Sequence, residues 1–73
     1  MTDSPEPKYT DRPSYEHARD ELIDIVAKLE AGDSTLEESL SLWERGEHLA
    51  AVCQDWLDGA QARLDATRPQ SED

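Results

Sequence analysis

Cysteine is nearly absent from this chain, and its absence limits how the fold can be stabilised. Cys53 is the single cysteine among 73 residues, so no disulfide can form within one chain. A hydrophobic core in a chain this short rarely supplies more than about 3–5 kcal/mol. We therefore expect a metal ion or a partner chain to supply the remaining stability.

Long apolar runs and a signal peptide are also missing. No stretch approaches the roughly 18 consecutive apolar residues that cross a membrane. A lone thiol in a chain without a signal peptide is typical of a reducing compartment. We therefore expect a cytoplasmic protein that makes no membrane contact.

Basic residues are few. The chain has 7 Lys and Arg against 18 Asp and Glu, which gives a formal net charge of −11. A surface that follows DNA phosphates needs clustered positive charge. We expect no direct contact with nucleic acid, although a partner chain could supply a positive groove.

Strand patterns are absent as well, since β-branched residues are few and polar and apolar residues do not alternate. Three of the four prolines lie in residues 1–13, and the fourth lies in residues 67–73. We predict that both ends are disordered tails. Residues 14–66 are predicted to form one all-α domain, a two-helix antiparallel hairpin with a turn at residues 31–34.

The first helix is predicted over about residues 14–31. Ser14 is its expected N-cap, and Gly32 is expected to end it in the left-handed conformation. Its apolar residues are spaced alternately three and four apart, which is typical of a helix–helix contact. They are Tyr15, Ala18, Leu22, Ile25 and Leu29, with Val26 beside them.

The second helix is predicted over about residues 36–66. A capping box formed by Ser34 with Glu37, or by Thr35 with Glu38, marks its start. Two stripes follow at heptad spacing. The first contains Leu36, Leu40, Trp43, Glu47, Ala50, Gln54, Leu57, Gln61 and Leu64, and the second contains Leu42, Gly46, Leu49, Cys53, Trp56 and Ala60. Together they cover roughly 200° of the helix circumference. That arc is too wide for one neighbouring helix.

We assign the first stripe, from Leu36 to Ala50, to the contact within the hairpin. The second stripe and the far end of the second helix are assigned to partner chains. The predicted hairpin core is Tyr15, Leu22, Ile25, Val26, Leu29, Leu36, Leu40, Trp43 and Ala50. The predicted partner interface is Leu42, Gly46, Leu49, Cys53, Trp56, Leu57, Ala60 and Leu64. Gly46 costs about 1 kcal/mol relative to alanine inside a helix, which suggests that another backbone comes close there.

The two helices differ in length. At about 1.5 Å per residue, the first spans about 27 Å and the second about 46 Å. About the last twelve residues of the second helix therefore have nothing within the chain to pack on. That segment contains four apolar residues, and an exposed apolar surface usually marks an interaction site. We expect oligomerisation to complete the fold.

No residue set matches a catalytic, cofactor or metal site. His17 and His48 lie on different helices, and neither follows an acid by three residues, as in carboxylate-bridged metal bundles. His48 and Cys53 lie about 140° apart around a helix. Acid pairs such as Glu37 and Glu38 stabilise a helix N-terminus. We interpret the histidines as solvated surface residues and Cys53 as a small buried apolar residue.

Several short motifs occur in order along both helices. They are Tyr15-Glu16, Ala18, Leu22, Ile25-Val26, Leu29-Glu30-Ala31-Gly32, Leu36-Glu37-Glu38-Ser39-Leu40, Trp43-Glu44-Arg45-Gly46, Leu49 and Cys53. This ordered set, within a match from about Ser14 to Ala60, resembles the small subunit of bacterial exodeoxyribonuclease VII. Trp43 replaces the Phe or Tyr more common in that family. Gly59 and Gln61 replace residues that are usually acidic, which leaves the end of the second helix open.

The resemblance implies a complex that degrades single-stranded DNA from both ends into oligonucleotides. The large subunit of such a complex carries the DNA-binding and nuclease sites. Several small subunits bind an extended helical part of the large one and support it. The resemblance therefore implies a non-catalytic subunit whose partners are the large subunit and other copies of itself.

Two other hypotheses compete with this one. A free-standing acidic adaptor or DNA mimic would bind a partner's basic groove, and its binding would depend strongly on salt. A small metal-dependent hydrolase would cleave single-stranded DNA by itself in the presence of Mg²⁺.

Overall fold

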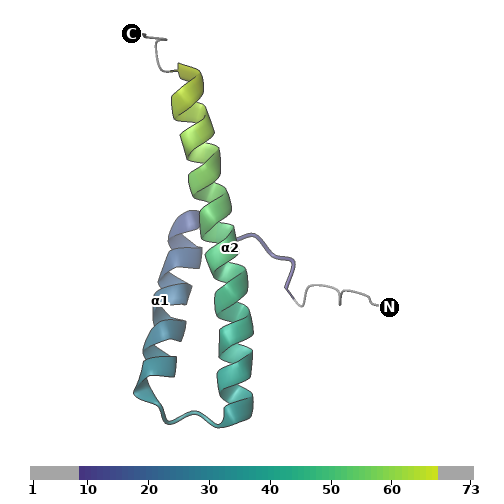
Figure 1. Cartoon of the computed structure of the whole chain (residues 1–73), viewed down its shortest axis with the longest axis vertical. Coiled ribbons are helices and arrows are strands. Elements are labelled where there is room, and N and C mark those ends of the chain that lie inside the picture. Colours follow the sequence, from purple (N-terminus) through teal and green to yellow (C-terminus); the bar gives the residue numbers. More distant parts are fainter. Residues whose placement is uncertain (1–8, 68–73) are drawn as a thin grey trace, which may run out of the picture.

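A computed structural model describes residues 9–67 of the chain, and two helices account for most of them. Helix α1 runs over Tyr15–Ala31 and helix α2 over Leu36–Thr67. The two helices pack side by side as a hairpin, and α2 continues well past the start of α1 (Figure 1). The described residues contain no strand. The all-α hairpin predicted from the sequence is confirmed.

Local capping contacts set the helix ends. The Ser14 hydroxyl accepts a hydrogen bond from the His17 amide at 3.2 Å, and Gly32 ends α1 with a left-handed φ of 74°. At the start of α2 the Thr35 hydroxyl accepts from the Glu38 amide at 3.1 Å, and the Glu38 carboxylate accepts from the Thr35 amide at 2.9 Å. This reciprocal pair is a capping box, so the second of the two alternatives from the sequence is the one that forms.

The far end of α2 lies one residue beyond the prediction. The Thr67 hydroxyl donates to the backbone carbonyls of Arg63 and Leu64, each at 3.2 Å, so Thr67 belongs to the helix and not to a tail. Neither described helix combines the length and the apolar character that crossing a membrane requires.

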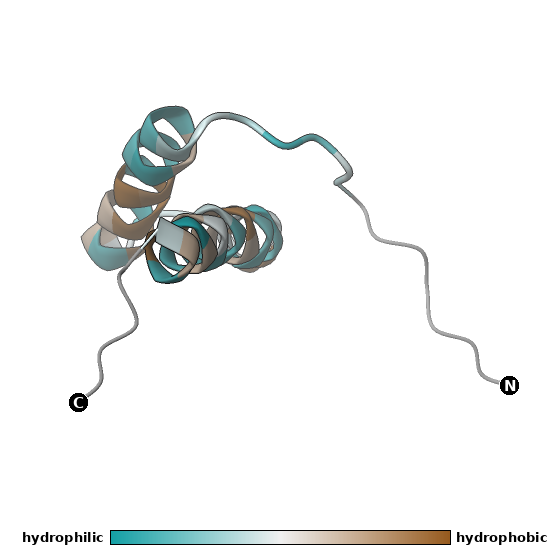
Figure 2. Cartoon of the chain, turned by 90° about the horizontal axis from the view of Figure 1, so that it is seen from above, coloured by the Kyte–Doolittle hydropathy of each residue, from teal (hydrophilic) through white to brown (hydrophobic). Residues whose placement is uncertain are grey.

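The core lies between the two helices and is small. Its buried members are Ala18, Ile25, Leu49 and Val52, and the half-buried Leu22, Leu29, Leu42 and Cys53 pack against them. Leu49 is the largest fully buried side chain of the described residues, with 0% exposure. Figure 2 shows hydrophobic and hydrophilic segments alternating on the ribbons of both helices, as expected for amphipathic helices.

The stripe of α2 that faces α1 is the opposite of the one assigned from the sequence. Leu42, Gly46, Leu49 and Cys53 were assigned to partners, yet they pack within the hairpin. Four residues assigned to the hairpin core are exposed on α2, namely Leu36, Leu40, Trp43 and Ala50. Val26 of α1 was also assigned to the core and is exposed. Tyr15 is half-buried outside the core cluster.

Polar residues explain this correction. The first stripe alternates its apolar residues with Glu47, Gln54 and Gln61, which would be buried if that stripe faced α1. Burying a polar group without a hydrogen-bond partner costs free energy. The second stripe carries no charged residue, so it can face α1 without that cost. Both stripes have the same period, and only their polar positions distinguish them.

Gly46 lies against α1, but no second backbone comes close to it. A Cβ atom at Gly46 would lie 3.5 Å from the Ile25 Cγ2 atom and 3.7 Å from the Leu22 Cδ1 atom, both in side chains. These are ordinary van der Waals distances. Within the described chain, the nearest atoms to Gly46 are therefore side-chain atoms of α1 and not another backbone.

Residues 9–13, which precede α1, form an N-terminal strap that crosses α2 (Figures 1 and 2). Asp11, Arg12 and Pro13 all contact side chains of α2. The prediction of a disordered tail over residues 1–13 is wrong for this strap. The rest of that tail, together with residues 68–73, lies outside the described residues.

Candidate partner-binding surface

The two sides of the hairpin differ in what covers them. The strap covers one side of α2, and Arg45 stands at the centre of that contact. The Arg45 guanidinium donates two hydrogen bonds to Glu21 of α1, at 2.8 and 3.0 Å, and two to Asp11 of the strap, at 2.9 and 3.0 Å. Arg45 therefore joins all three segments through paired hydrogen bonds of the geometry that guanidinium and carboxylate groups favour.

The same contacts change the proton affinities of these groups. Hydrogen bonds from Arg45 lower the pKa of both Asp11 and Glu21, while burial opposes the change. Hydrogen bonds to Glu21 and Asp11 raise the pKa of Arg45 further above its already high value. All three groups are therefore charged at neutral pH.

Two further side chains of α2 fasten the strap. His48 Nε2 lies 2.7 Å from the Asp11 carbonyl oxygen and 3.2 Å from a carboxylate oxygen of the same residue. The Trp56 indole N–H donates to the Pro13 carbonyl at 2.8 Å, and the Arg12 guanidinium lies 4.2 Å from the centre of the Trp56 ring. The His48 side chain is 19% exposed, so the prediction of a solvated surface histidine is wrong for this residue.

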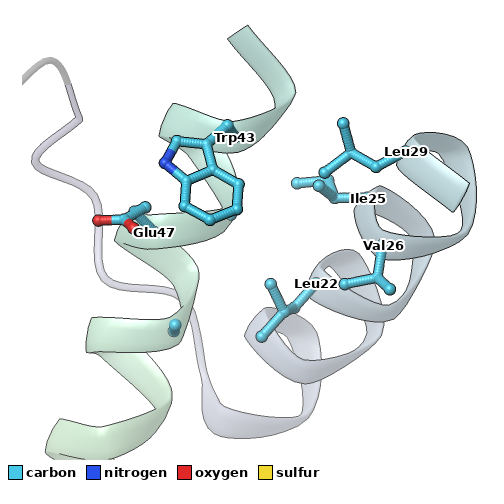
Figure 3. Close-up of a pocket in the computed structure, with 8 residues that line it drawn as sticks. Leu22, Ile25, Val26, Leu29, Trp43 and Glu47 are labelled. Atoms are coloured by element: carbon cyan, nitrogen blue, oxygen red, sulfur yellow. The ribbon is translucent and has the colours of Figure 1, made fainter. Parts of the chain in front are cut away.

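The other side of the hairpin carries an apolar groove of about 210 Å³. From α1 it is lined by Leu22, Ile25, Val26 and Leu29, and from α2 by Trp43, Gly46, Glu47 and Ala50. Figure 3 shows the Trp43 ring on α2 facing Ile25 and Leu29 across the groove. The Trp43 side chain remains 59% exposed, so this groove is open to solvent.

The apolar surface continues from the groove along α2. We call Leu36, Trp43, Ala50, Leu57 and Leu64 the exposed stripe, and we call this stripe together with the groove the open face. Leu36 is 77% exposed and Leu64 is 61% exposed. The stripe thus reaches from the first residue of α2 to the part that extends beyond α1. Glu47, Gln54 and Gln61 lie between members of the stripe. A row of exposed apolar residues of this kind usually marks an interaction site.

The residues assigned to a partner interface therefore divide into three sets. Leu42, Gly46, Leu49 and Cys53 face α1. Trp56 is held by the strap. Leu57, Ala60 and Leu64 are exposed on the part of α2 beyond α1.

Sequence reasoning missed the strap and the buried Val52. Val52 lies beside the second stripe and not within its heptad positions, so the spacing rule left it out. Proline-rich composition concealed the strap. The pairing of acidic Asp11 with Arg45, one of only four basic residues in the two helices, is the signal that could have revealed it.

The described residues offer no evident metal chemistry. Across residues 9–67, no group of three or more His, Cys, Asp or Glu side chains is placed to hold a metal ion. Asp11 and Glu21 do meet, but at the Arg45 guanidinium, which pairs with both carboxylates. The arrangement supports binding between proteins better than catalysis.

Comparison with known proteins gives a consistent result. The family described as "Exonuclease VII small subunit" matches residues 15–66, which span both helices. The chain belongs to the exonuclease VII small subunit family. The resemblance drawn from the sequence motifs is confirmed, and membership in this family implies a complex with a large subunit.

Curated relatives carry the same description. The exodeoxyribonuclease 7 small subunit of Streptomyces avermitilis is 66% identical over 58 residues, covering 80% of this chain and 72% of the relative. The Acidothermus cellulolyticus protein is 70% identical over 57 residues, which cover 78% of this chain and 59% of the relative. The Cutibacterium acnes protein is 50% identical over 74 residues, which cover 99% of this chain and 95% of the relative. No solved structure matches this member of the family.

Proposed function

We propose that this chain is a non-catalytic subunit of an exodeoxyribonuclease VII, a complex that degrades single-stranded DNA from both ends into oligonucleotides. The chain acts by packing its helices on the large subunit. One observation carries the proposal: α2 exposes a stripe of apolar residues over its whole length, and α1 leaves that stripe uncovered. Binding to a partner would remove this surface from water.

The net charge of the chain favours a role in assembly with the large subunit and opposes direct binding to DNA. A net charge of −11 repels the phosphates of single-stranded DNA. The large subunit therefore supplies the contacts to DNA and the groups that cleave it. The net charge also keeps free copies of the small subunit apart, so copies come together when they assemble on the large subunit.

An acidic DNA mimic would share the charge but has no need of the exposed stripe. Its binding would weaken sharply with added salt, whereas binding through the stripe weakens little. The dependence of partner binding on ionic strength therefore separates the two hypotheses.

Reconstitution tests the proposed function. The chain and the large subunit of the same organism are purified separately and assayed on single-stranded DNA, alone and mixed, with and without Mg²⁺. We expect no turnover by the chain alone, a stable complex on mixing, and more activity from the complex than from the large subunit alone. Turnover by the chain alone, or a mixture that neither associates nor gains activity, would contradict the proposal.

A further inference from the structure

We infer that a pocket between the strap and α2 binds a carboxylate, and that this carboxylate comes from the turn of a second copy of this chain. The inference rests on the proposed function, because it names a contact that neighbouring copies make once the large subunit holds them side by side. We call the site the arginine pocket. It is lined by Arg12 of the strap and by Asp55, Trp56, Gly59, Ala60 and Arg63 of α2.

The strap and α2 build the arginine pocket together. The Trp56 indole N–H donates to the Pro13 carbonyl at 2.8 Å, which holds this end of the strap on the tryptophan. The Arg12 guanidinium lies 4.2 Å from the centre of the Trp56 ring. Gly59 leaves the floor open, because a Cβ atom placed there would meet nothing within 4 Å. The pocket has a volume of about 190 Å³ and takes one arginine from each segment.

Both arginines of the pocket are available to an acid. The described residues contain five Lys and Arg, and two of the five line this one pocket. Within residues 9–67 neither Arg12 nor Arg63 forms an ion pair, although Asp55 also lines the pocket. Guanidinium groups pair with carboxylates through charge-assisted hydrogen bonds, which are stronger beside an apolar surface such as the Trp56 ring.

The other end of the hairpin supplies carboxylates. Glu30, Asp33 and Glu37 lie around the turn between α1 and α2, and all three are exposed. No hydrogen bond or ion pair joins their carboxylates to another residue of the described part. Along α2, Glu37 and Arg63 are about 39 Å apart at about 1.5 Å per residue, and the turn lies far from this part of α2 (Figure 1). One copy therefore cannot close the contact on itself.

A contact between the turn of one copy and the pocket of another runs head to tail, so it repeats from copy to copy. Copies that present the same open face to one long partner are related by a shift along that partner. Such a shift brings the turn of one copy toward the far end of the next. Repulsion between chains of net charge −11 opposes the contact in free solution. On the large subunit the neighbours are held at a high effective concentration, and the contact forms there.

A phosphate of single-stranded DNA is the competing occupant, because guanidinium groups bind phosphates as well as carboxylates. Single-stranded DNA binds along a groove in which basic residues follow several phosphates. The lining of the arginine pocket offers two basic residues and Asp55, which is itself acidic. A single carboxylate from a folded neighbour fits this short site better than a chain of phosphates does.

Charge reversal tests the inference in the complex. Arg63→Glu reverses a charge of the pocket, Asp33→Arg reverses a charge of the turn, and a third variant carries both changes. The matched control is Arg19→Glu, which makes the same charge change as Arg63→Glu at an exposed position of α1 outside the lining of the pocket. Each variant is first checked by circular dichroism. It is then titrated into the purified large subunit, and native mass spectrometry counts the small subunits bound at each concentration.

We expect Arg63→Glu and Asp33→Arg each to raise the half-saturating concentration at least about threefold, because each places like charges opposite each other between copies. Binding of the first copy, which has no neighbour, should not change. The variant with both changes restores opposite charges between copies and should return to within about twofold of the unmodified chain. The Arg19→Glu control should also stay within about twofold, because exposed charges outside a contact contribute little.

Unchanged assembly in both single variants, or no recovery in the variant with both changes, would overturn the inference. Weaker binding of the first copy in Arg63→Glu alone would place an acidic segment of the large subunit in the pocket, which also overturns it. So would normal assembly of Arg63→Glu combined with weaker binding of a labelled single-stranded oligonucleotide, because a phosphate would then be the occupant. Failure of the unmodified chain to bind the large subunit would instead overturn the proposed function.

Discussion

Leu49 and Trp43 are both large apolar residues of α2, yet they lie in opposite surroundings. Leu49 is fully buried against α1, whereas Trp43 is mostly exposed. The free energy of unfolding should therefore respond to Leu49 and hardly at all to Trp43.

Truncation to alanine tests this difference. Leu49→Ala should lower the free energy of unfolding of the isolated chain by about 2–5 kcal/mol, because it leaves a cavity in the only described core. Trp43→Ala should change it by less than about 1 kcal/mol, because surface positions have small effects. Urea denaturation followed by circular dichroism measures both. A larger loss for Trp43→Ala than for Leu49→Ala would contradict the observed packing.

The sequence predicted the core residues of α1 better than those of α2. Helix α1 has one apolar stripe, so Leu22, Ile25 and Leu29 could be assigned from spacing alone. Ile25 is buried in the core, and Leu22 and Leu29 pack against it. Helix α2 has two stripes of equal period, and spacing could not rank them. The polar Glu47 within the first stripe contained the deciding information, because a buried unpaired carboxylate is costly.

The helices and the strap also differ in how far the sequence determines them. Local contacts fix where each helix begins and ends. The capping pair of Thr35 and Glu38 joins residues three positions apart, so it could be predicted from the sequence. The strap depends on contacts between positions far apart, such as Asp11 with Arg45 and Pro13 with Trp56. The composition of a short segment does not show which distant residues it contacts, so the sequence predicts disorder for a proline-rich segment.

Acid should release the strap. The pKa values of Asp11 and Glu21 lie below their ordinary values of 3.8 and 4.5 in the folded chain, chiefly because Arg45 donates hydrogen bonds to both carboxylates. A lowered folded pKa means that these groups favour the folded state above the ordinary values and lose that contribution as the pH falls through the lowered ones. The strap contact should therefore persist at neutral pH and weaken below about pH 4.

The indole N–H resonance of Trp56 reports this change, because that group donates to the Pro13 carbonyl. We expect its chemical shift to stay constant from pH 7 to about pH 5 and to move below about pH 4. In Arg45→Gln the resonance should already be displaced at pH 7 and should show no comparable acid step. An unchanged Trp56 shift down to pH 2.5 in the unmodified chain would contradict the assigned role of Arg45.

At the scale of the whole molecule, the described chain has one side closed by its own strap and one side left open. The closed side uses charged and aromatic contacts, and the open side presents apolar residues bordered by acids. The sequence predicted that the second helix is too long and has too wide an apolar surface to be covered by the first helix. It could not predict which side remains open, because the strap and the polar positions of α2 decide that together.

Hydroxyl-radical footprinting of the chain, free and bound to the large subunit, tests the central claim most directly. Trp43 lies on the open face, and Tyr9 and His48 lie on the strap side, where their rings are 5.7 Å apart. We predict that binding slows oxidation of Trp43 several-fold and leaves oxidation of Tyr9 and His48 nearly unchanged. Oxidation of Trp43 at the same rate in the free and bound chain, with protection on the strap side instead, would contradict the account.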